Sequence, residues 1–161
     1  MLYHKYKPLA SRVYCTGLAL LLVLSEVFSS NVQDTLPGFS RIMRLGLTGC
    51  AVLLLAGKII LLTGYEARWQ KVLIAVVLVY TAFSSWYGGD LWFFLAALIG
   101  LGAKDVDWET ALRVYLVTAV AGLVLVQLLH FATPLMPYKF YCRNWDFGYG
   151  HYNGFGARLV G

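Results

Sequence analysis

Apolar runs separated by short polar segments make up most of this chain. The runs cover residues 13–28, 45–62, 72–87, 91–103 and 114–131. Because an α-helix rises about 1.5 Å per residue, the run 45–62 extends about 27 Å, close to the roughly 30 Å hydrocarbon core of a bilayer. The pattern predicts an all-α fold, a polytopic transmembrane helical bundle of about five spans in a single domain, 1–161. Residues 157–161 resemble the start of a sixth span, so we expect an N-terminal part of a longer protein.

The apolar stretch 72–103 is too long for one crossing, since as a single helix it would extend about 48 Å. Polar and small residues interrupt it between Ser84 and Asp90, and Gly88-Gly89-Asp90 is typical of a turn. We therefore predict a hairpin of 72–87 and 91–103, whose second arm is short enough to be a re-entrant segment instead. Acidic residues around Asp107 precede the last span and suit a helix N-terminus.

The composition excludes a water-soluble domain. Hydrophobic residues form 60% of the chain and charged residues 13%, whereas soluble domains carry about 25% charged residues. The net charge of +5 does not indicate nucleic-acid binding, because the basic residues lie between apolar runs, where they orient spans. The three cysteines, Cys15, Cys50 and Cys142, are scattered and odd in number, which predicts neither a disulfide framework nor a metal site. We expect no cofactor.

The distribution of basic residues predicts a cytoplasmic N-terminus in the cell membrane. In that orientation the inner set is larger than the outer set, and the tight turn 88–90, placed outside, has no basic residue. The inner set is Lys5, Lys7, Arg12, Arg68, Lys71, Lys104 and Arg113, and the outer set is Arg41, Arg44, Lys139, Arg143 and Arg158. The first run is either a retained anchor, which we favour, or a cleaved signal peptide, and both insert in the same orientation.

Four polar residues fall within predicted spans or near their ends. Glu26 lies close to the polar turn that follows the first span, which favours an interfacial role over a functional carboxylate within the membrane. Lys58 lies about one turn from the inner end of its span, so we expect it to reach the headgroups by snorkelling. Gln127 and His130 are three residues apart on one helix face, which favours a hydrogen bond in helix packing over a proton relay.

The segment 138–158, which follows the last span, is the candidate functional site. Arg143 and Arg158 can hold phosphate oxygens through paired donors. The aromatic rings of this segment are flat faces suited to sugars, and they are equally typical of a membrane interface. His151 can act as a general base near neutral pH, and Asn153 can orient a hydroxyl. Ligand binding and simple interfacial anchoring therefore both remain open for this segment.

Two stretches of the chain resemble Gram-positive polysaccharide repeat-unit polymerases. The first contains Gly88-Gly89-Asp90, an apolar arm, and then Gly102-Ala103-Lys104-Asp105, similar to a turn, an apolar arm and a Gly-Ala-Lys-Asn/Asp sequence in that family. The second runs from Arg143 to Phe155, where Gly150-His151-Tyr152-Asn153 is similar to the Gly-His-Pro-Asn sequence of the family, with tyrosine in place of its proline. The spacing from Arg143 to Gly154 also fits a pattern of O-antigen polymerases.

The resemblance covers residues 65–161 and implies a Wzy-type polymerase of capsule, exopolysaccharide or O-antigen, an enzyme that needs no metal. Its substrate would be a polyprenyl-diphosphate-linked oligosaccharide at the outer leaflet, with a flippase and a chain-length regulator as partners alongside membrane lipids. Arg143 and Arg158 would hold the diphosphate, and His151 and Asn153 would lie near the reacting sugars. Family members have more spans and a second arginine-bearing outer loop. The alternatives are an O-antigen-ligase-like transferase and a non-enzymatic membrane component.

Overall fold

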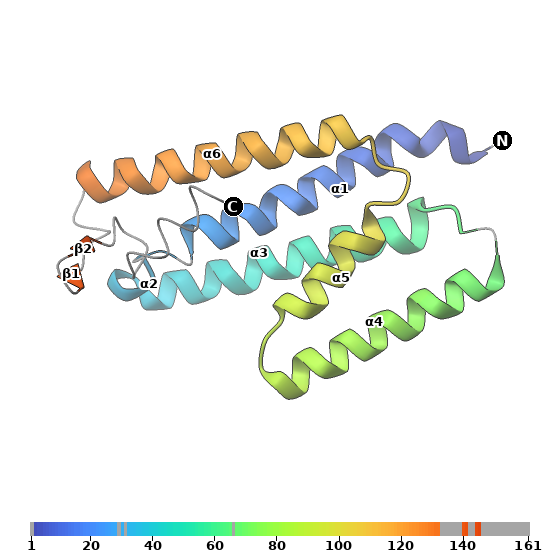
Figure 1. Ribbon diagram of the computed structural model, residues 1–161, viewed down its shortest axis with the longest axis horizontal. Helices are drawn as coiled ribbons and strands as arrows, with labels where there is room; N and C mark the ends of the chain where they lie inside the picture. Colours follow the sequence, from blue (N-terminus) through green and yellow to red (C-terminus); the bar gives the residue numbers. More distant parts are fainter. Residues whose placement is uncertain are drawn as a thin grey trace. The chain divides into compact units, whose positions relative to one another are not determined.

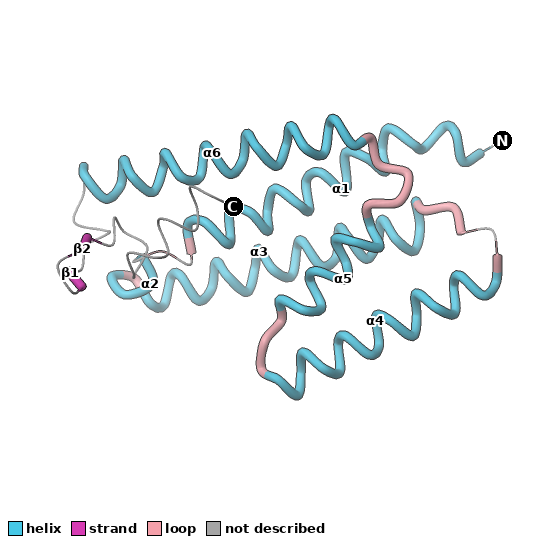
Figure 2. Tube along the Cα trace, viewed as in Figure 1, coloured by secondary structure: helices cyan, strands magenta, loops and turns pink. Residues whose placement is uncertain are grey.

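The computed structural model describes residues 2–28, 30, 32–65 and 67–132, together with two short strands at 140–141 and 144–145. Within them the chain is all-α apart from that strand pair (Figures 1 and 2), as predicted. The elements are α1 (Leu2–Val27), α2 (Val32–Thr35), α3 (Pro37–Gly57), η1 (Lys58–Leu62), α4 (Arg68–Gly88), α5 (Trp92–Gly102), α6 (Trp108–Ala132), β1 (Phe140–Tyr141) and β2 (Asn144–Trp145). The element η1 is a π-helical turn that directly continues α3. The strands β1 and β2 pair antiparallel.

Among the described residues, four helical segments are long and apolar enough to cross a bilayer, which makes the chain a polytopic membrane protein. They are Lys7–Val27, Pro37–Leu62, Arg68–Gly88 and Trp108–Ala132. The remaining apolar helix, α5, has 11 residues and would extend only about 16 Å, half of a hydrocarbon core. The fourth of the five predicted spans is therefore a short helix, in line with the re-entrant alternative.

The helices α1 and α3 begin well before the apolar runs that predicted them. The helix α3 begins at Pro37, eight residues before the apolar run 45–62, and α1 begins at Leu2 instead of residue 13. Hydropathy marks only the part of a helix that lies in hydrocarbon. The hydrogen-bonded backbone continues through the headgroup region, where basic and aromatic residues are favourable.

The predicted turn between the two arms of the hairpin is confirmed. Gly89 follows α4 with a left-handed φ of 68°, a conformation that glycine adopts without steric cost. The Asp90 carboxylate accepts a hydrogen bond from the backbone N–H of Trp92 at 2.9 Å, at the start of α5. The Ser85 hydroxyl of α4 accepts another from the N–H of Phe94 at 3.1 Å. Two side chains thus take up N–H groups of the first turn of α5, and α4 packs against α5 (Figure 1).

The chain divides into two compact units. The first comprises Met1–Leu18 and Cys50–Leu112, and the second comprises Ala19–Gly49 and Arg113–Gly161. In the first unit a Cβ added to Gly17 of α1 would lie 3.0 Å from Cγ of the fully buried Leu55 of α3. A Cβ on Gly102 would lie 3.3 Å from the ring of Tyr14. Small residues therefore let α1 approach both α3 and α5 closely, as is common in membrane helix packing.

In the second unit α6 packs against α1 at Gly122. A Cβ added to Gly122 would lie 2.9 Å from Cβ and 3.0 Å from Cγ of Glu26. The Glu26 side chain is buried, with 6% of its surface exposed, so the expected access of water from the polar turn is wrong, while the interfacial depth of Glu26 stays a prediction. The carboxylate lies instead between packed helices.

Replacing Gly122 by alanine is expected to destabilise the protein by about 1–3 kcal/mol, because the new methyl group overlaps a Cβ that cannot move without its backbone. The matched control is Gly46→Ala in α3, where no heavy atom lies within 4 Å of the added Cβ, and where alanine should stabilise the helix by up to about 1 kcal/mol. Unfolding midpoints of the detergent-solubilised protein compare the two. Equal midpoints would show that α1 and α6 do not pack at Gly122.

Candidate functional site

The residues that the sequence singled out as the site lie outside the part of the chain that the structure describes. These are Arg143, His151, Asn153 and Arg158. The described structure includes α6, which ends at Ala132, and within their segment the short strands β1 and β2. Within the described helices, two other places gather polar side chains: a junction of two lysines and a cavity at the start of α3.

The first half of the lysine junction is the ammonium group of Lys58. No part of the Lys58 surface is exposed, and its Nζ donates hydrogen bonds to the carbonyl oxygens of Gly102, at 2.5 Å, and of Lys104. Gly102 is the last residue of α5, and carbonyls at a helix C-terminus lack intrahelical donors and carry partial negative charge. Lys58 therefore caps α5, and the expected snorkelling to the headgroups is wrong.

The second half of the lysine junction is the ammonium group of Lys104, in the loop after α5, which contacts the loop after η1. Lys104 donates from Nζ to the carbonyl oxygen of Gly64 at 2.7 Å and lies 4.5 Å from the centre of the Tyr65 ring, a cation–π contact. The Tyr65 hydroxyl in turn donates to the carbonyl oxygen of Leu101 at 3.1 Å. Burial, and then the nearby Asp105 carboxylate, raises the pKa of the Tyr65 hydroxyl above its ordinary value, so the hydroxyl stays a hydrogen-bond donor well above neutral pH.

The hydrogen bonds of the junction show what the residues Gly102-Ala103-Lys104-Asp105 do in this chain. Two of its carbonyls accept from Lys58, and its lysine joins the loop after η1. Asp105 adopts a left-handed φ of 63°, and Asp107 then caps α6 by accepting from the N–H of Thr110 at 2.9 Å, as the acidic residues predicted. All of these contacts connect helix ends, so the stretch has a structural role here.

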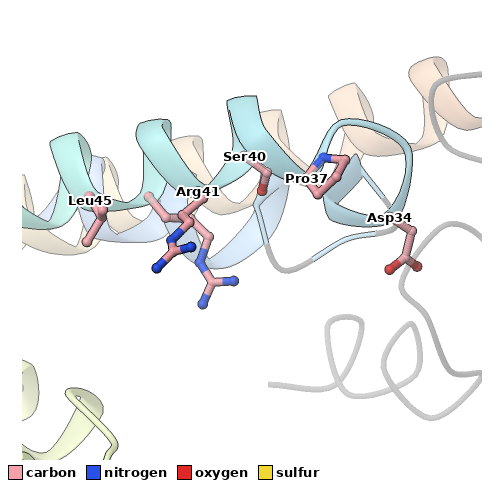
Figure 3. A pocket seen from close by; sticks show the side chains of 6 residues that line it. Asp34, Pro37, Ser40, Arg41 and Leu45 are labelled. Carbon is pink, nitrogen blue, oxygen red and sulfur yellow. The ribbon is translucent and has the colours of Figure 1, made fainter.

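The second polar place is a cavity of about 500 Å³ at the start of α3 (Figure 3), called here the α3 cavity. It is lined by Asp34, Pro37, Ser40, Arg41, Arg44 and Leu45. Pro37 suits the first helical position because it has no N–H to satisfy and its φ is preset. From that start, Ser40 ends the first turn and Arg41 begins the second, and Arg44 lies about one turn after Arg41 on the same helix face.

Ser40 is the unusual member of the α3 cavity. Its side chain is 1% exposed, and its hydroxyl oxygen has no hydrogen-bond partner among the described residues. Figure 3 shows this oxygen on the cavity side of α3, next to Arg41. A buried hydroxyl without a partner costs about 1–3 kcal/mol, which makes this position costly as long as the cavity holds no hydrogen-bonding group.

The α3 cavity was not predicted from the sequence, which used Arg41 and Arg44 only to set the orientation of the chain. Their spacing of three residues, directly after a Pro-Gly helix start, is the signal that could have indicated it. For Gln127 and His130, the expected hydrogen bond stays a prediction. The His130 ring packs edge-on against Phe131 at 4.9 Å between centroids.

No protein-family model, curated protein or solved structure shows significant similarity to the chain. The class of protein defined by its helices is thus a polytopic all-α membrane protein.

Proposed function

We propose that residues 1–161 belong to a membrane glycan polymerase, which elongates polysaccharide from polyprenyl-diphosphate-linked repeat units at the outer leaflet. The observation that carries the proposal is the end of α6. This apolar helix of 25 residues stops at Ala132, and at about 37 Å it is long enough to reach the headgroup region. The segment with Arg143, His151, Asn153 and Arg158 follows α6 in the sequence, so we expect it to lie near the headgroups, where the diphosphate groups of lipid carriers are found.

The chemistry of these residues fits glycosyl transfer. Guanidinium groups of Arg143 and Arg158 would hold the diphosphate of the growing chain as its bond to the first sugar breaks. His151 would take the proton from the sugar hydroxyl that forms the new glycosidic bond, and Asn153 would orient that hydroxyl. The carrier diphosphate leaves and the growing chain moves onto the next repeat unit. The direct test is the length of the glycan made when Arg143 is replaced.

The proposal also requires the segment 138–158 to face the cell exterior. In a variant that keeps only Cys142, with Cys15 and Cys50 replaced by alanine, a maleimide that cannot cross the bilayer is expected to label Cys142 in intact cells. The control places a single cysteine at Arg68, the exposed first residue of α4, which the charge distribution assigns to the cytoplasm and which should be labelled only after lysis. Labelling of Cys142 only after lysis would overturn both the orientation and the polymerase.

A further inference from the structure

We propose that the α3 cavity binds the phosphate group of a membrane lipid, with Arg41, Arg44 and the Ser40 hydroxyl as its donors. The inference stands apart from the polymerase proposal, because it concerns other residues and any lipid with a terminal phosphate. It begins with the Ser40 hydroxyl, which is 1% exposed and has no partner among the described residues. Buried hydroxyls are almost always hydrogen-bonded, so this one indicates a ligand that supplies the missing partner.

The charges around the hydroxyl select an anion. Arg41 and Arg44 are exposed residues that line the same cavity, and planar guanidinium groups hold phosphate oxygens through paired, charge-assisted hydrogen bonds. The cavity also lies at the N-terminal end of α3, a helix of 21 residues, where the helix dipole favours negative charge. Asp34 is the acidic residue in the lining, and Figure 3 shows it at the far end of the cavity from Arg41. The arginine end therefore suits a phosphate dianion.

The depth of the α3 cavity favours a lipid as the source of the phosphate. The candidate span Pro37–Leu62 has 26 residues and extends about 39 Å, whereas the hydrocarbon core is about 30 Å thick. The apolar part of this span is 45–62, so the excess length falls on its first two turns. The α3 cavity is then at headgroup depth, where lipid phosphates are concentrated and arginine side chains are stable.

Binding to the purified full chain in detergent tests the inference with three probes: dioctanoyl phosphatidic acid, dioctanoylglycerol and inorganic phosphate. We expect phosphatidic acid to bind and dioctanoylglycerol, which lacks the phosphate, to bind at least about tenfold more weakly. The double variant Arg41→Gln, Arg44→Gln should weaken the binding of phosphatidic acid by about tenfold or more, because it removes charge-assisted hydrogen bonds to the phosphate. Ser40→Ala should weaken the binding of phosphatidic acid severalfold. It should not lower the unfolding midpoint of the ligand-free protein, because the hydroxyl that it removes has no hydrogen-bond partner among the described residues.

The matched control removes two exposed arginines elsewhere, Arg68→Gln with Arg113→Gln, and should leave binding unchanged. An equal loss of phosphatidic acid binding in both double variants would show that the effect arises from net charge alone, and it would overturn the site. Inorganic phosphate binding as tightly as phosphatidic acid would overturn the lipid as the source. If phosphatidic acid binds as expected while replacing Arg143 leaves glycan length unchanged, the α3 cavity stands and the polymerase fails. Normal binding of phosphatidic acid by the Arg41→Gln, Arg44→Gln variant would overturn the α3 cavity and leave the polymerase proposal untouched.

Discussion

Replacing Arg143 by lysine is expected to abolish elongation of the surface glycan while the protein stays at its normal level in the membrane. Lysine keeps the positive charge but presents a single ammonium group, which cannot form the paired hydrogen bonds of a planar guanidinium with a diphosphate. If Arg143 stabilises the leaving diphosphate, losing that geometry should slow the transfer step by at least about a hundredfold, as for other preorganised charge-stabilising donors. Gel separation of glycans from cells that carry the full reading frame measures the chain length.

The control for this prediction is Arg68→Lys, which changes an exposed arginine at the start of α4 and should leave the glycan length unchanged. Glycans of normal length from the Arg143→Lys cells would refute the role of Arg143 in elongation. A ligase-like transferase would give a different result. The Arg143→Lys variant would then block attachment of the glycan to its acceptor without changing the length of the polymer. A non-enzymatic component would tolerate both lysine variants equally.

Replacing Lys58 by alanine is expected to destabilise the folded protein by about 3 kcal/mol or more. The substitution removes two hydrogen bonds from a charged donor, to the carbonyl oxygens of Gly102 and Lys104, and each such bond contributes about 1.5–3 kcal/mol. It also leaves space around a side chain that has no exposed surface, which adds a cavity cost. Unfolding of the purified protein by SDS or heat in detergent measures the loss.

Two further variants separate the contributions at Lys58. Lys58→Met keeps most of the volume without the donor, so it should retain the larger part of the destabilisation if the hydrogen bonds dominate. Lys71→Ala removes an exposed lysine of α4 and should shift the midpoint by less than about 0.5 kcal/mol. An unfolding midpoint for Lys58→Ala that matches Lys71→Ala would contradict the contacts between η1 and α5.

The fold class could be predicted from the sequence because it depends on local pattern. Apolar runs of span length must be helical in a bilayer, since every backbone N–H and C=O needs a partner there. The turn at Gly88-Gly89-Asp90 and the cap at Asp107 were equally local, because glycine at positive φ and a carboxylate at a helix start act within a few residues. The predicted bounds of the fourth apolar segment, 91–103, were close to those of α5, Trp92–Gly102, but hydropathy alone left open whether this segment crosses the bilayer or is re-entrant.

Contacts between helices were beyond the sequence, because they depend on which faces meet. Lys58 has the same local surroundings whether it snorkels to headgroups or caps α5, and only the approach of α5 to η1 decides between them. Glu26 is buried because Gly122 of α6 lies against it, which no feature near Glu26 in the chain indicates. Arg41 and Arg44 became a candidate site only when the structure placed beside them a buried Ser40 hydroxyl that has no hydrogen-bond partner among the described residues.

The amino-acid sequence by itself thus determined that this is a helical membrane protein and where the chain turns between α4 and α5. Tertiary structure alone decided which polar groups are satisfied within the protein and which line a cavity. The physical reason is range: hydropathy, turns and caps act over a few neighbouring residues, whereas burial and hydrogen bonding of a long side chain depend on helices far apart in the chain.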